Sequence, residues 1–285
     1  FDKLFNNADK AQSLIVTSHS PTLASIAPLR SVVRLCRDDC GRTHAFSLAK
    51  QPVTTDELDD IERYLTATRA ELLFAKGVIF VEGDAEEVLI PGFAEAMGLN
   101  LDELGITVCS VAGVNFEPYV KLAGSLGIRI AVITDWDPLD GSKQPLGKAR
   151  AISIWDAFCA VRPEMHKLSA EEKAWFVDKG FEECSDVWKK AGIFLSPQTF
   201  EVSVANTPIL KDALLNILDA QGFGSLRSSR IASWRTGQDP EPAQLLAMIS
   251  DIGKGRLAAK LKKKASGLAP PEYIAAAIQY VVSNV

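Results

Sequence analysis

Three short, largely apolar segments constrain the fold of this chain more than any other feature. They are Val78–Val81, Ile106–Val111 and Ile128–Ile133. A strand that is buried on both faces reads as a nearly continuous apolar run, as these segments do. The stretches 85–97 and 115–126, which separate them, have the composition of helices. The order strand, helix, strand, helix, strand predicts an α/β fold with a parallel sheet and right-handed crossovers.

The segments before this unit predict a smaller region with further strands. Ser13–Thr17 reads as a buried parallel strand that leads into the polar loop Ser18–Pro21. Ser31–Cys36 and Thr43–Leu48 read as two more strands with a polar turn between them. A helix is expected from about residue 55 to residue 75.

The segments after the unit are expected to be mainly helical. Residues 140–148 read as a polar loop that contains glycine and proline, and a strand is expected at Phe200–Val204. The expected helices lie at 149–162, 170–192, 208–221, 242–249, 256–264 and 271–282. The predicted architecture is therefore a parallel sheet flanked by helices, with additional helices inserted.

The composition limits the class of protein. Hydrophobic residues make up 47% of the 285 residues and charged residues 24%, which is typical of a folded soluble protein. No apolar run reaches the roughly 18 residues that a membrane-spanning helix needs. The cysteines are scattered, no signal-like segment follows Phe1, and Cys36 and Cys40 lack the second ligand pair of a zinc site. We therefore expect a cytoplasmic protein, and the missing initial methionine suggests a piece of a longer one.

Carboxylates follow the first and third predicted strands. Glu82 comes directly after the first strand, and Glu86 lies in the first turn of the next helix. Asp135 and Asp137 follow the third strand and point to the same side if the chain there is extended. The carboxyl ends of parallel strands meet at one edge of a sheet, so we expect these four side chains to converge. Close carboxylates raise one another's pKa values, and a bound divalent cation, Mg²⁺ or Mn²⁺ rather than zinc, removes that cost.

Several of the acidic residues in this region also have a simpler explanation. Asp84 and Glu87, which lie between them, are better explained as the two members of a capping box at the helix start. Glu86 alone is explained by the attraction of an acid to the helix dipole, and Asp135 alone by a cap or turn. The combination of Glu-Gly after one strand and Asp-x-Asp after another favours the metal site.

The same residues resemble those of a known domain. Val78–Gly83, Gly113 and Ile133–Asp137 resemble the TOPRIM domain of topoisomerases, DnaG-type primases and several nucleases. Glu82–Pro91, with Glu-Gly-x-x-Glu before an apolar helix and a proline, is similar to the nucleases of the overcoming-lysogenization-defect (OLD) family. The resemblance implies a Rossmann-like TOPRIM fold that holds two Mg²⁺ or Mn²⁺ ions.

OLD nucleases join an ABC-type ATPase to a C-terminal TOPRIM domain, and the resemblance implies the same organisation here. Leu14–Pro21 is similar to the last strand and switch-histidine loop of such an ATPase. No Gly-x-x-x-x-Gly-Lys-Ser/Thr loop occurs, so this chain alone is not expected to bind ATP. Residues 1–70 would be the ATPase tail with a connecting helix, and residues 71–285 the TOPRIM nuclease domain, with a helical insertion at about 140–195. The resemblance also implies an N-terminal ATPase domain as partner and a homodimer of the full-length protein.

Two downstream residues complete the site that the resemblance implies. Pro197–Glu201 resembles the family's Thr-Leu-Glu strand, with Phe200 in place of leucine, and the glutamate of that strand serves a second metal. Gly253–Arg256 resembles the family's Lys-Gly segment, whose lysine, Lys254 here, contacts the reacting phosphate. The alternatives are an exposed strand residue for Glu201 and a solvated loop charge for Lys254.

The net charge of −5 argues against a nucleic-acid-binding protein unless much of it belongs to a metal site. A basic stretch supplies the opposite charge locally and contains Lys254, Arg256, Lys260, Lys262, Lys263 and Lys264. We expect Lys254, Arg256 and Lys260 to bind DNA, with a solvated helix face as the alternative.

The expected function is metal-dependent endonuclease activity that nicks and cleaves DNA. Two metals would act together, one held by Glu82, Asp135 and Asp137 and the other by Glu86 and Glu201. The alternatives are a TOPRIM module that binds metal and nucleic acid without cutting, an RNA-processing nuclease, and a structural segment that couples to the ATPase. A topoisomerase is not supported, because no tyrosine lies near these motifs in the sequence.

Overall fold

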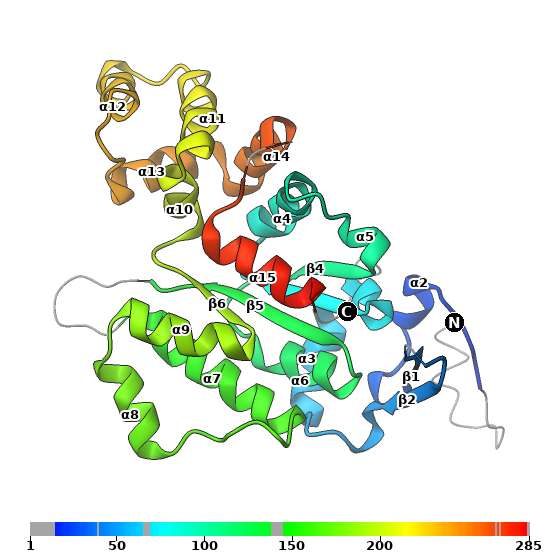
Figure 1. Cartoon of the computed structure of the whole chain (residues 1–285). Helices are drawn as coiled ribbons and strands as arrows, with labels where there is room; N and C mark the ends of the chain where they lie inside the picture. The colour runs from blue at the N-terminus through cyan, green and yellow to red at the C-terminus, as the bar shows by residue number, and fades with distance from the viewer. Residues whose placement is uncertain are drawn as a thin grey trace.

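A computed structural model describes residues 15–38, 40–64, 69–137, 145–265, 267 and 269–283 of the chain. Its centre is a four-stranded sheet in the order β4-β3-β5-β6, in which all neighbouring strands are parallel (Figure 1). The strands are β3 (Gly77–Val81), β4 (Ile106–Ser110), β5 (Arg129–Asp135) and β6 (Ile193–Ser196). The predicted parallel α/β fold is confirmed, and β6 adds a strand beside β5.

Helices connect these strands and cover both faces of the sheet (Figure 1). Those between consecutive strands are, in chain order, α4 (Asp84–Ala96), α5 (Leu101–Leu104), α6 (Glu117–Ser125), α7 (Leu146–Val161), α8 (Ala170–Asp178) and α9 (Phe181–Ala191). None of the helices in the described part of the chain is long and apolar enough to cross a membrane.

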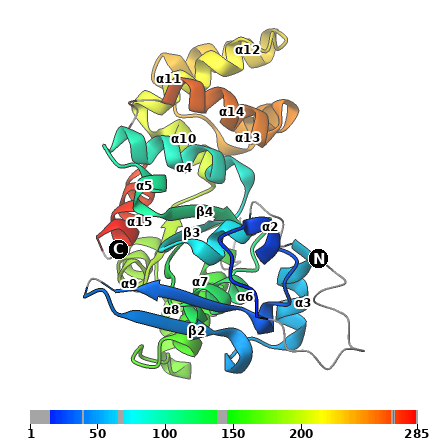
Figure 2. The same ribbon diagram turned by 90° about the vertical axis from the view of Figure 1, so that its right-hand side faces the viewer.

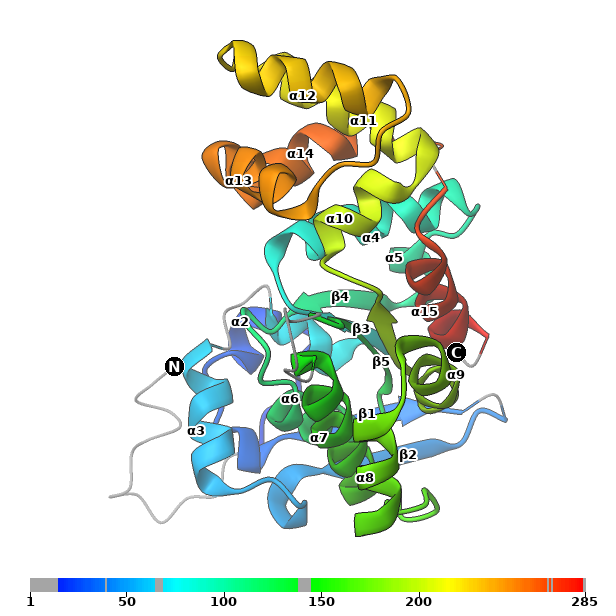
Figure 3. The ribbon, with the colours of Figure 1, turned by 90° about the vertical axis from the view of Figure 1, so that its left-hand side faces the viewer.

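The chain after β6 forms a helical lobe, which we define as α10 to α14. Its helices are α10 (Phe200–Asn206), α11 (Pro208–Asp219), α12 (Ser225–Arg235), α13 (Pro242–Ile252) and α14 (Lys254–Ala265). The lobe projects from one side of the sheet, and α14 packs along α4 (Figures 1 and 3). The last helix, α15 (Glu272–Val282), returns to the sheet and packs on β5 and β6.

The two faces of the sheet are buried in two separate cores, which explains why the strands are so apolar. All five residues of β3 are buried, and successive side chains point to opposite faces. Val78 and Phe80 belong to the core with α6 and α7, whereas Ile79 and Val81 belong to the core with α4, α15 and the helical lobe. The strand ends therefore lie between two helical layers.

The residues before β3 form a small region on the opposite side of the molecule from the helical lobe (Figures 2 and 3). It contains α2 (Pro21–Ala24), η1 (Leu29–Ser31), β1 (Val33–Arg37), β2 (Thr43–Ser47), η2 (Leu48–Lys50), α3 (Thr55–Tyr64) and η3 (Arg69–Phe74). The strands β1 and β2 pair as an antiparallel hairpin, which confirms the two predicted strands. Arg34 of the hairpin donates hydrogen bonds to the carbonyls of Ala75 (2.7 Å) and Leu126 (2.9 Å), which ties the hairpin to the sheet region.

Some predicted elements are wrong, and the reasons are local. The part of Ser13–Thr17 that the structure describes is not a strand, and Ile15 is 89% exposed, because no described strand lies beside it. The predicted strand at Phe200–Val204 is the helix α10. Periodicity does not separate a short strand from a short buried helix, and the strand here is β6, just before it.

The helix boundaries also differ from those predicted. Residues 170–192 form two helices because Lys179 and Gly180 between them have extended backbones. The helix expected from residue 55 to residue 75 ends at Tyr64, residues 65–68 lie outside the described residues, and η3 follows. The helix α12 was not predicted, because it buries only Ile231 and Trp234 and has little apolar periodicity.

Candidate metal centre at the carboxyl edge of the sheet

Glu82 lies directly after β3 and is held by several donors. Its Oε1 atom accepts hydrogen bonds from the backbone N–H of Asp135 (2.9 Å), the hydroxyl of Thr134 (2.5 Å) and Nη1 of Arg150 (2.5 Å). Its backbone carbonyl accepts a hydrogen bond from the N–H of Gly113 (2.9 Å), whose φ of +151° favours glycine. The Glu82 carboxylate is therefore fixed at the edge where β3, β4 and β5 end.

The Asp-x-Asp segment turns at the end of β5. Asp135 is the last residue of β5, whereas Asp137 has a left-handed φ of +48°, which aspartate adopts more readily than most residues. The expectation of an extended Asp-x-Asp segment is therefore wrong. The Asp137 carboxylate still faces the site, because it accepts a hydrogen bond from Nη2 of Arg150 (2.6 Å). Burial and then the neighbouring carboxylates, Glu82 first, raise the pKa of Asp135 to about 9.

Glu86 faces the same edge from the first turn of α4. The residue is only 8% exposed. Burial, and then the charges of Glu201 and Glu82, raise the pKa of its carboxyl group to about 7. A carboxyl group with such a pKa is one that lacks enough compensating positive charge.

The predicted capping box at the start of α4 is wrong. Gly83 is the N-cap residue, and Asp84 is already the first residue of the helix. The Glu87 carboxylate instead accepts a hydrogen bond from the backbone N–H of Ser110 (3.1 Å) at the end of β4. Glu87 thus connects α4 to β4.

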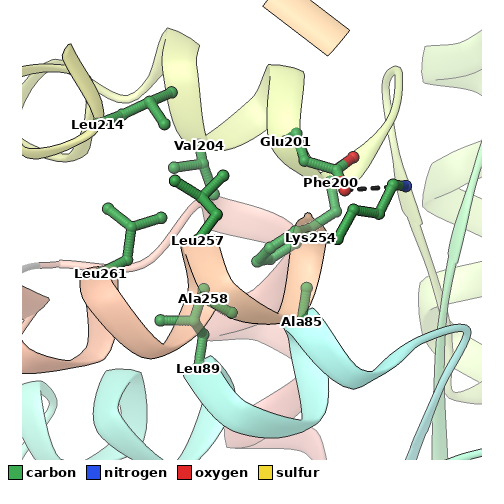
Figure 4. A pocket seen from close by; sticks show the side chains of 10 residues that line it. All are labelled: Ala85, Leu89, Phe200, Glu201, Val204, Leu214, Lys254, Leu257, Ala258 and Leu261. Atoms are coloured by element: carbon green, nitrogen blue, oxygen red, sulfur yellow. Dashed lines mark ion pairs between the residues drawn. The ribbon is translucent and has the colours of Figure 1, made fainter. Parts of the chain in front are cut away.

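The helical lobe contributes two further residues to this edge. Glu201 lies in the first turn of α10 and is 4% exposed, so the alternative of an exposed strand residue is wrong. Its Oε1 atom forms an ion pair with Nζ of Lys254, the first residue of α14, at 2.9 Å (Figure 4). The other carboxylate oxygen, Oε2, is buried and has no hydrogen-bond partner among the described residues. Burial alone would lower the pKa of Lys254, but the hydrogen bond to Glu201 and the nearby carboxylates raise it.

A pocket between α4 and the helical lobe ends at this ion pair (Figure 4). Its other walls are apolar, and its lining residues are Ala85, Leu89, Phe200, Glu201, Val204, Leu214, Lys254, Leu257, Ala258 and Leu261. The apolar packing of α14 on α4 therefore determines how far the lobe's charged residues lie from those of the sheet.

Arg150 on α7 is the residue of the site that the sequence reasoning missed. Its Nη1 atom also donates hydrogen bonds to the Thr134 hydroxyl (2.7 Å) and the Asp135 carbonyl (3.2 Å), and its side chain is 9% exposed. Residues 138–144, which separate it from the Asp-x-Asp segment, lie outside the described residues. The sequence contains one feature that could have indicated this role. Lys148 and Arg150 are two cations near the start of α7, where the helix dipole disfavours positive charge.

The donor set fits a hard divalent cation. Among the described residues, the edge gathers five carboxylates and two cationic side chains, Lys254 and Arg150. Carboxylate oxygens are the ligands that Mg²⁺ and Mn²⁺ prefer, and Oε2 of Glu201 has no hydrogen-bond partner in the described part of the chain. Within the described ranges, however, no group of three or more acidic, histidine or cysteine side chains is arranged so that it could hold a metal ion. The Arg150 guanidinium lies between two of the carboxylates, those of Glu82 and Asp137.

The other predicted DNA-binding residues lie along α14, beyond the carboxylates. Arg256 is exposed and Lys260 is partly exposed, whereas Leu257 and Leu261 of the same helix are buried. Residues four apart on a helix lie on one side of it, so Arg256 and Lys260 form a basic stripe. Arg256 comes two residues after Lys254, about 200° around the helix axis, so the stripe lies on a different side of α14 from Lys254.

Comparisons with known proteins agree with this arrangement. The model of the overcoming lysogenization defect protein-like TOPRIM domain matches residues 73–137. A curated relative, the uncharacterized protein YbjD of Escherichia coli strain K12, is 32% identical over 123 residues, which are 43% of this chain and 22% of the relative. The chain therefore spans about a fifth of that relative's length.

Two solved structures are similar over most of the chain. The C-terminal region of the Burkholderia pseudomallei OLD protein is 33% identical, with a TM-score of 0.63, and the match covers 74% of this chain and 98% of that one. The C-terminal region of the Xanthomonas campestris pv. campestris OLD protein is 30% identical, with a TM-score of 0.62, and the match covers 75% and 95% of the two chains.

A glutamate after one parallel strand and an Asp-x-Asp segment after its neighbour define a TOPRIM domain, a class of domain that binds divalent metal ions. The chain belongs to the OLD family, and it corresponds to the C-terminal region of OLD proteins.

Proposed function

We propose that this chain is a metal-dependent endonuclease module that hydrolyses phosphodiester bonds in DNA, both nicking and cleaving it. The observation that carries the proposal is the cluster of five carboxylates at one sheet edge, of which Glu86 and Glu201 are buried. Burial and mutual repulsion raise the pKa of Glu86 to about 7 and that of Asp135 to about 9. A folded protein keeps such a costly cluster where it has a use, and binding of divalent cations is the use that fits oxygen ligands.

The proposed ligands form two groups on either side of the edge. Glu82, Asp135 and Asp137 at the strand ends would hold one Mg²⁺ or Mn²⁺ ion, and Glu86 and Glu201 would hold the second. When bound, such a pair of ions activates a water molecule and stabilises the leaving oxygen. The division follows the elements that carry the ligands, because Glu86 and Glu201 lie on helices, whereas the other three carboxylates follow or end strands.

The residues of the chain itself would position the carboxylates and the substrate. The N–H of Asp135 and the hydroxyl of Thr134 hold Oε1 of Glu82, which is also the oxygen that Arg150 contacts. Lys254, whose side chain is 65% exposed and pairs with Glu201, would neutralise a phosphate group. Arg256 and Lys260, on another side of α14, would contact the DNA backbone.

The connection to an ATPase is part of the proposal. The chain lacks a Gly-x-x-x-x-Gly-Lys-Ser/Thr loop, so ATP would bind to an N-terminal ATPase domain rather than here. We place the boundary near residue 70. The region before it is firmly attached, since Glu57 of α3 forms an ion pair of 2.6 Å with Lys121 of α6. A homodimer of the full-length protein is proposed as well.

The test is cleavage of supercoiled plasmid DNA with Mg²⁺ or Mn²⁺. We expect nicked and linear products from the wild type, and at least about a hundredfold lower rate from Asp135→Asn, which removes a proposed metal ligand. The matched control is Asp156→Asn, because Asp156 is an exposed aspartate on α7 that pairs only with Lys173 among the described residues.

Unchanged cleavage by Asp135→Asn would contradict the proposed site. Wild-type protein that shifts the mobility of DNA but never breaks it would instead identify a binding module, and breakage of RNA alone would identify an RNA-processing nuclease.

A further inference from the structure

Arg150 occupies a position at the carboxylate edge that a bound cation would also need. Its two terminal nitrogens contact different carboxylates: Nη1 lies 2.5 Å from Oε1 of Glu82, and Nη2 lies 2.6 Å from Oδ2 of Asp137. Charge-assisted hydrogen bonds of this length, made by both ends of one planar group, are strong and directional. The guanidinium therefore bridges the end of β3 and the turn after β5.

The start of α7 is built to hold Arg150 at this place. A side chain at Gly147 would put its Cβ atom 2.4 Å from the carbonyl oxygen of Asp135 and 2.7 Å from Cα of Trp136, so the helix touches the Asp-x-Asp backbone directly. The N–H of Gly147 donates a hydrogen bond to the Trp136 carbonyl (3.1 Å), and the buried Lys148 donates one to the Val177 carbonyl (2.6 Å). Arg150 follows three residues after Gly147, a little less than one helical turn.

Arginine differs from the other groups at this edge because its charge does not titrate in proteins. It therefore cannot release Glu82 and Asp137 by losing a proton. A divalent cation that uses the same two oxygens must displace the guanidinium, and until then the guanidinium neutralises part of the repulsion between the carboxylates.

We infer that Arg150 is an internal counter-ion of the metal site, displaced when a divalent cation binds and so setting the metal affinity of the site. The inference rests on the proposed function, since it needs Glu82 and Asp137 to be metal ligands. Arg150 is a positioning residue in this account, because it acts through the two carboxylates.

A purely structural role makes the opposite prediction. If Arg150 only braces the carboxylates in a binding geometry, its removal loosens the ligands and weakens metal binding. If Arg150 competes with the metal, the metal-free wild type can bind a cation only in those molecules whose guanidinium has left the carboxylates. Removing Arg150 then raises the metal affinity by the inverse of that fraction. A bridge formed in nine of ten molecules corresponds to an affinity gain of about tenfold.

The experiment is titration calorimetry of the chelator-treated protein with Mn²⁺ alone, and separately with Mg²⁺ alone. We expect Arg150→Gln to bind Mn²⁺ about tenfold more tightly than the wild type, or more. The Mn²⁺ affinity of Arg150→Lys is expected to lie between those of wild type and Arg150→Gln. Lysine keeps the positive charge but cannot bridge both carboxylates with a planar group. The matched control is Arg227→Gln, because Arg227 pairs with Asp251 in the helical lobe, away from the edge. The Mn²⁺ affinity of this variant should stay within about twofold of wild type.

Thermal unfolding supplies a second measurement. Without metal, Arg150→Gln should unfold at a lower temperature than wild type, because two partly buried carboxylates lose their partner. With Mn²⁺ at one fixed concentration, its melting temperature should rise by more than that of wild type. If Arg150→Gln does not fold, the same comparisons are made with Arg150→Lys.

Weaker or equal Mn²⁺ binding by the variants would overturn the inference and leave the metal site itself intact. Binding by Arg150→Gln with none by wild type would support it, because the bridge would then exclude metal completely. Binding by neither protein would refute the proposed metal site, and the inference with it.

Discussion

Glu86→Gln is expected to stabilise the metal-free protein, although it changes a side chain at the centre of the candidate site. Glutamine has nearly the same shape as glutamate but carries no charge. The wild-type carboxylate is buried at 8% exposure near Glu201 and Glu82, and no cation compensates it fully. Removing its charge therefore relieves both the loss of hydration and the repulsion.

The size of the effect follows from the pKa. Burial first, and then the neighbouring carboxylates, raise the pKa of Glu86 from 4.5 to about 7. One pH unit corresponds to about 1.4 kcal/mol, so the ionised side chain lowers the free energy of unfolding by about 3 kcal/mol above pH 7. Between pH 4.5 and 7 the folded protein retains a proton that the unfolded chain has lost. The loss of stability caused by Glu86 is therefore absent below pH 4.5 and grows as the pH rises to about 7.

The assay is urea unfolding in the presence of a chelator at pH 5, 6, 7 and 8. We expect Glu86→Gln to gain stability over wild type as the pH rises, by up to about 3 kcal/mol at pH 8. The matched control is Glu95→Gln on the exposed side of the same helix, which should differ from wild type by less than about 0.5 kcal/mol. The reasoning would be refuted if Glu86→Gln were less stable than wild type at pH 8, or if the difference between them did not change with pH.

Two further predictions concern the framework of the site. Gly147→Ala should lower the free energy of unfolding by about 2 kcal/mol, because the added carbon would lie 2.4 Å from the Asp135 carbonyl oxygen. The control is Gly92→Ala, where nothing lies within 4 Å and the change should stabilise the protein by up to about 1 kcal/mol. Thermal unfolding compares the two variants with wild type. Lys121→Met should cost about 1 kcal/mol at pH 7 in urea unfolding, because hydrogen bonds from Lys121 and the backbone outweigh the effect of burial and lower the pKa of Glu57. That loss should shrink as the pH falls below 4.5, and a loss that persisted there would contradict the assignment.

The parallel sheet and its strand-end carboxylates could be predicted because both depend on local patterns. Val78–Val81 is buried on two faces, so its apolar run is continuous, and Glu82 follows where such a strand must end. Neighbouring parallel strands end at the same edge whatever the details of the connections. The convergence of Glu82 and Asp135 therefore needed only the strand order β3-β5.

Other parts of the site depend on long-range packing that no local pattern shows. Glu201 was expected on a strand and lies on α10, because a short apolar run fits both and only the buried surroundings of the helical lobe decide between them. Arg150 reaches Glu82 because Gly147 allows α7 to touch the Asp-x-Asp turn, a contact between elements. The left-handed backbone of Asp137 likewise follows from the turn into that connection.

The packing of α14 on α4 determines the distance between one proposed metal ligand and the residue proposed to contact the phosphate. Glu86 lies on α4 and Lys254 lies on α14, so the apolar contact between these helices positions both side chains. Leu89 and Leu257, which meet in the pocket between these helices, carry no charge and donate no hydrogen bond from their side chains. Their volumes nevertheless set the distance between Glu86, a proposed metal ligand, and Lys254. A change of one methylene there would alter the reach of Lys254 toward a phosphate that neither leucine touches.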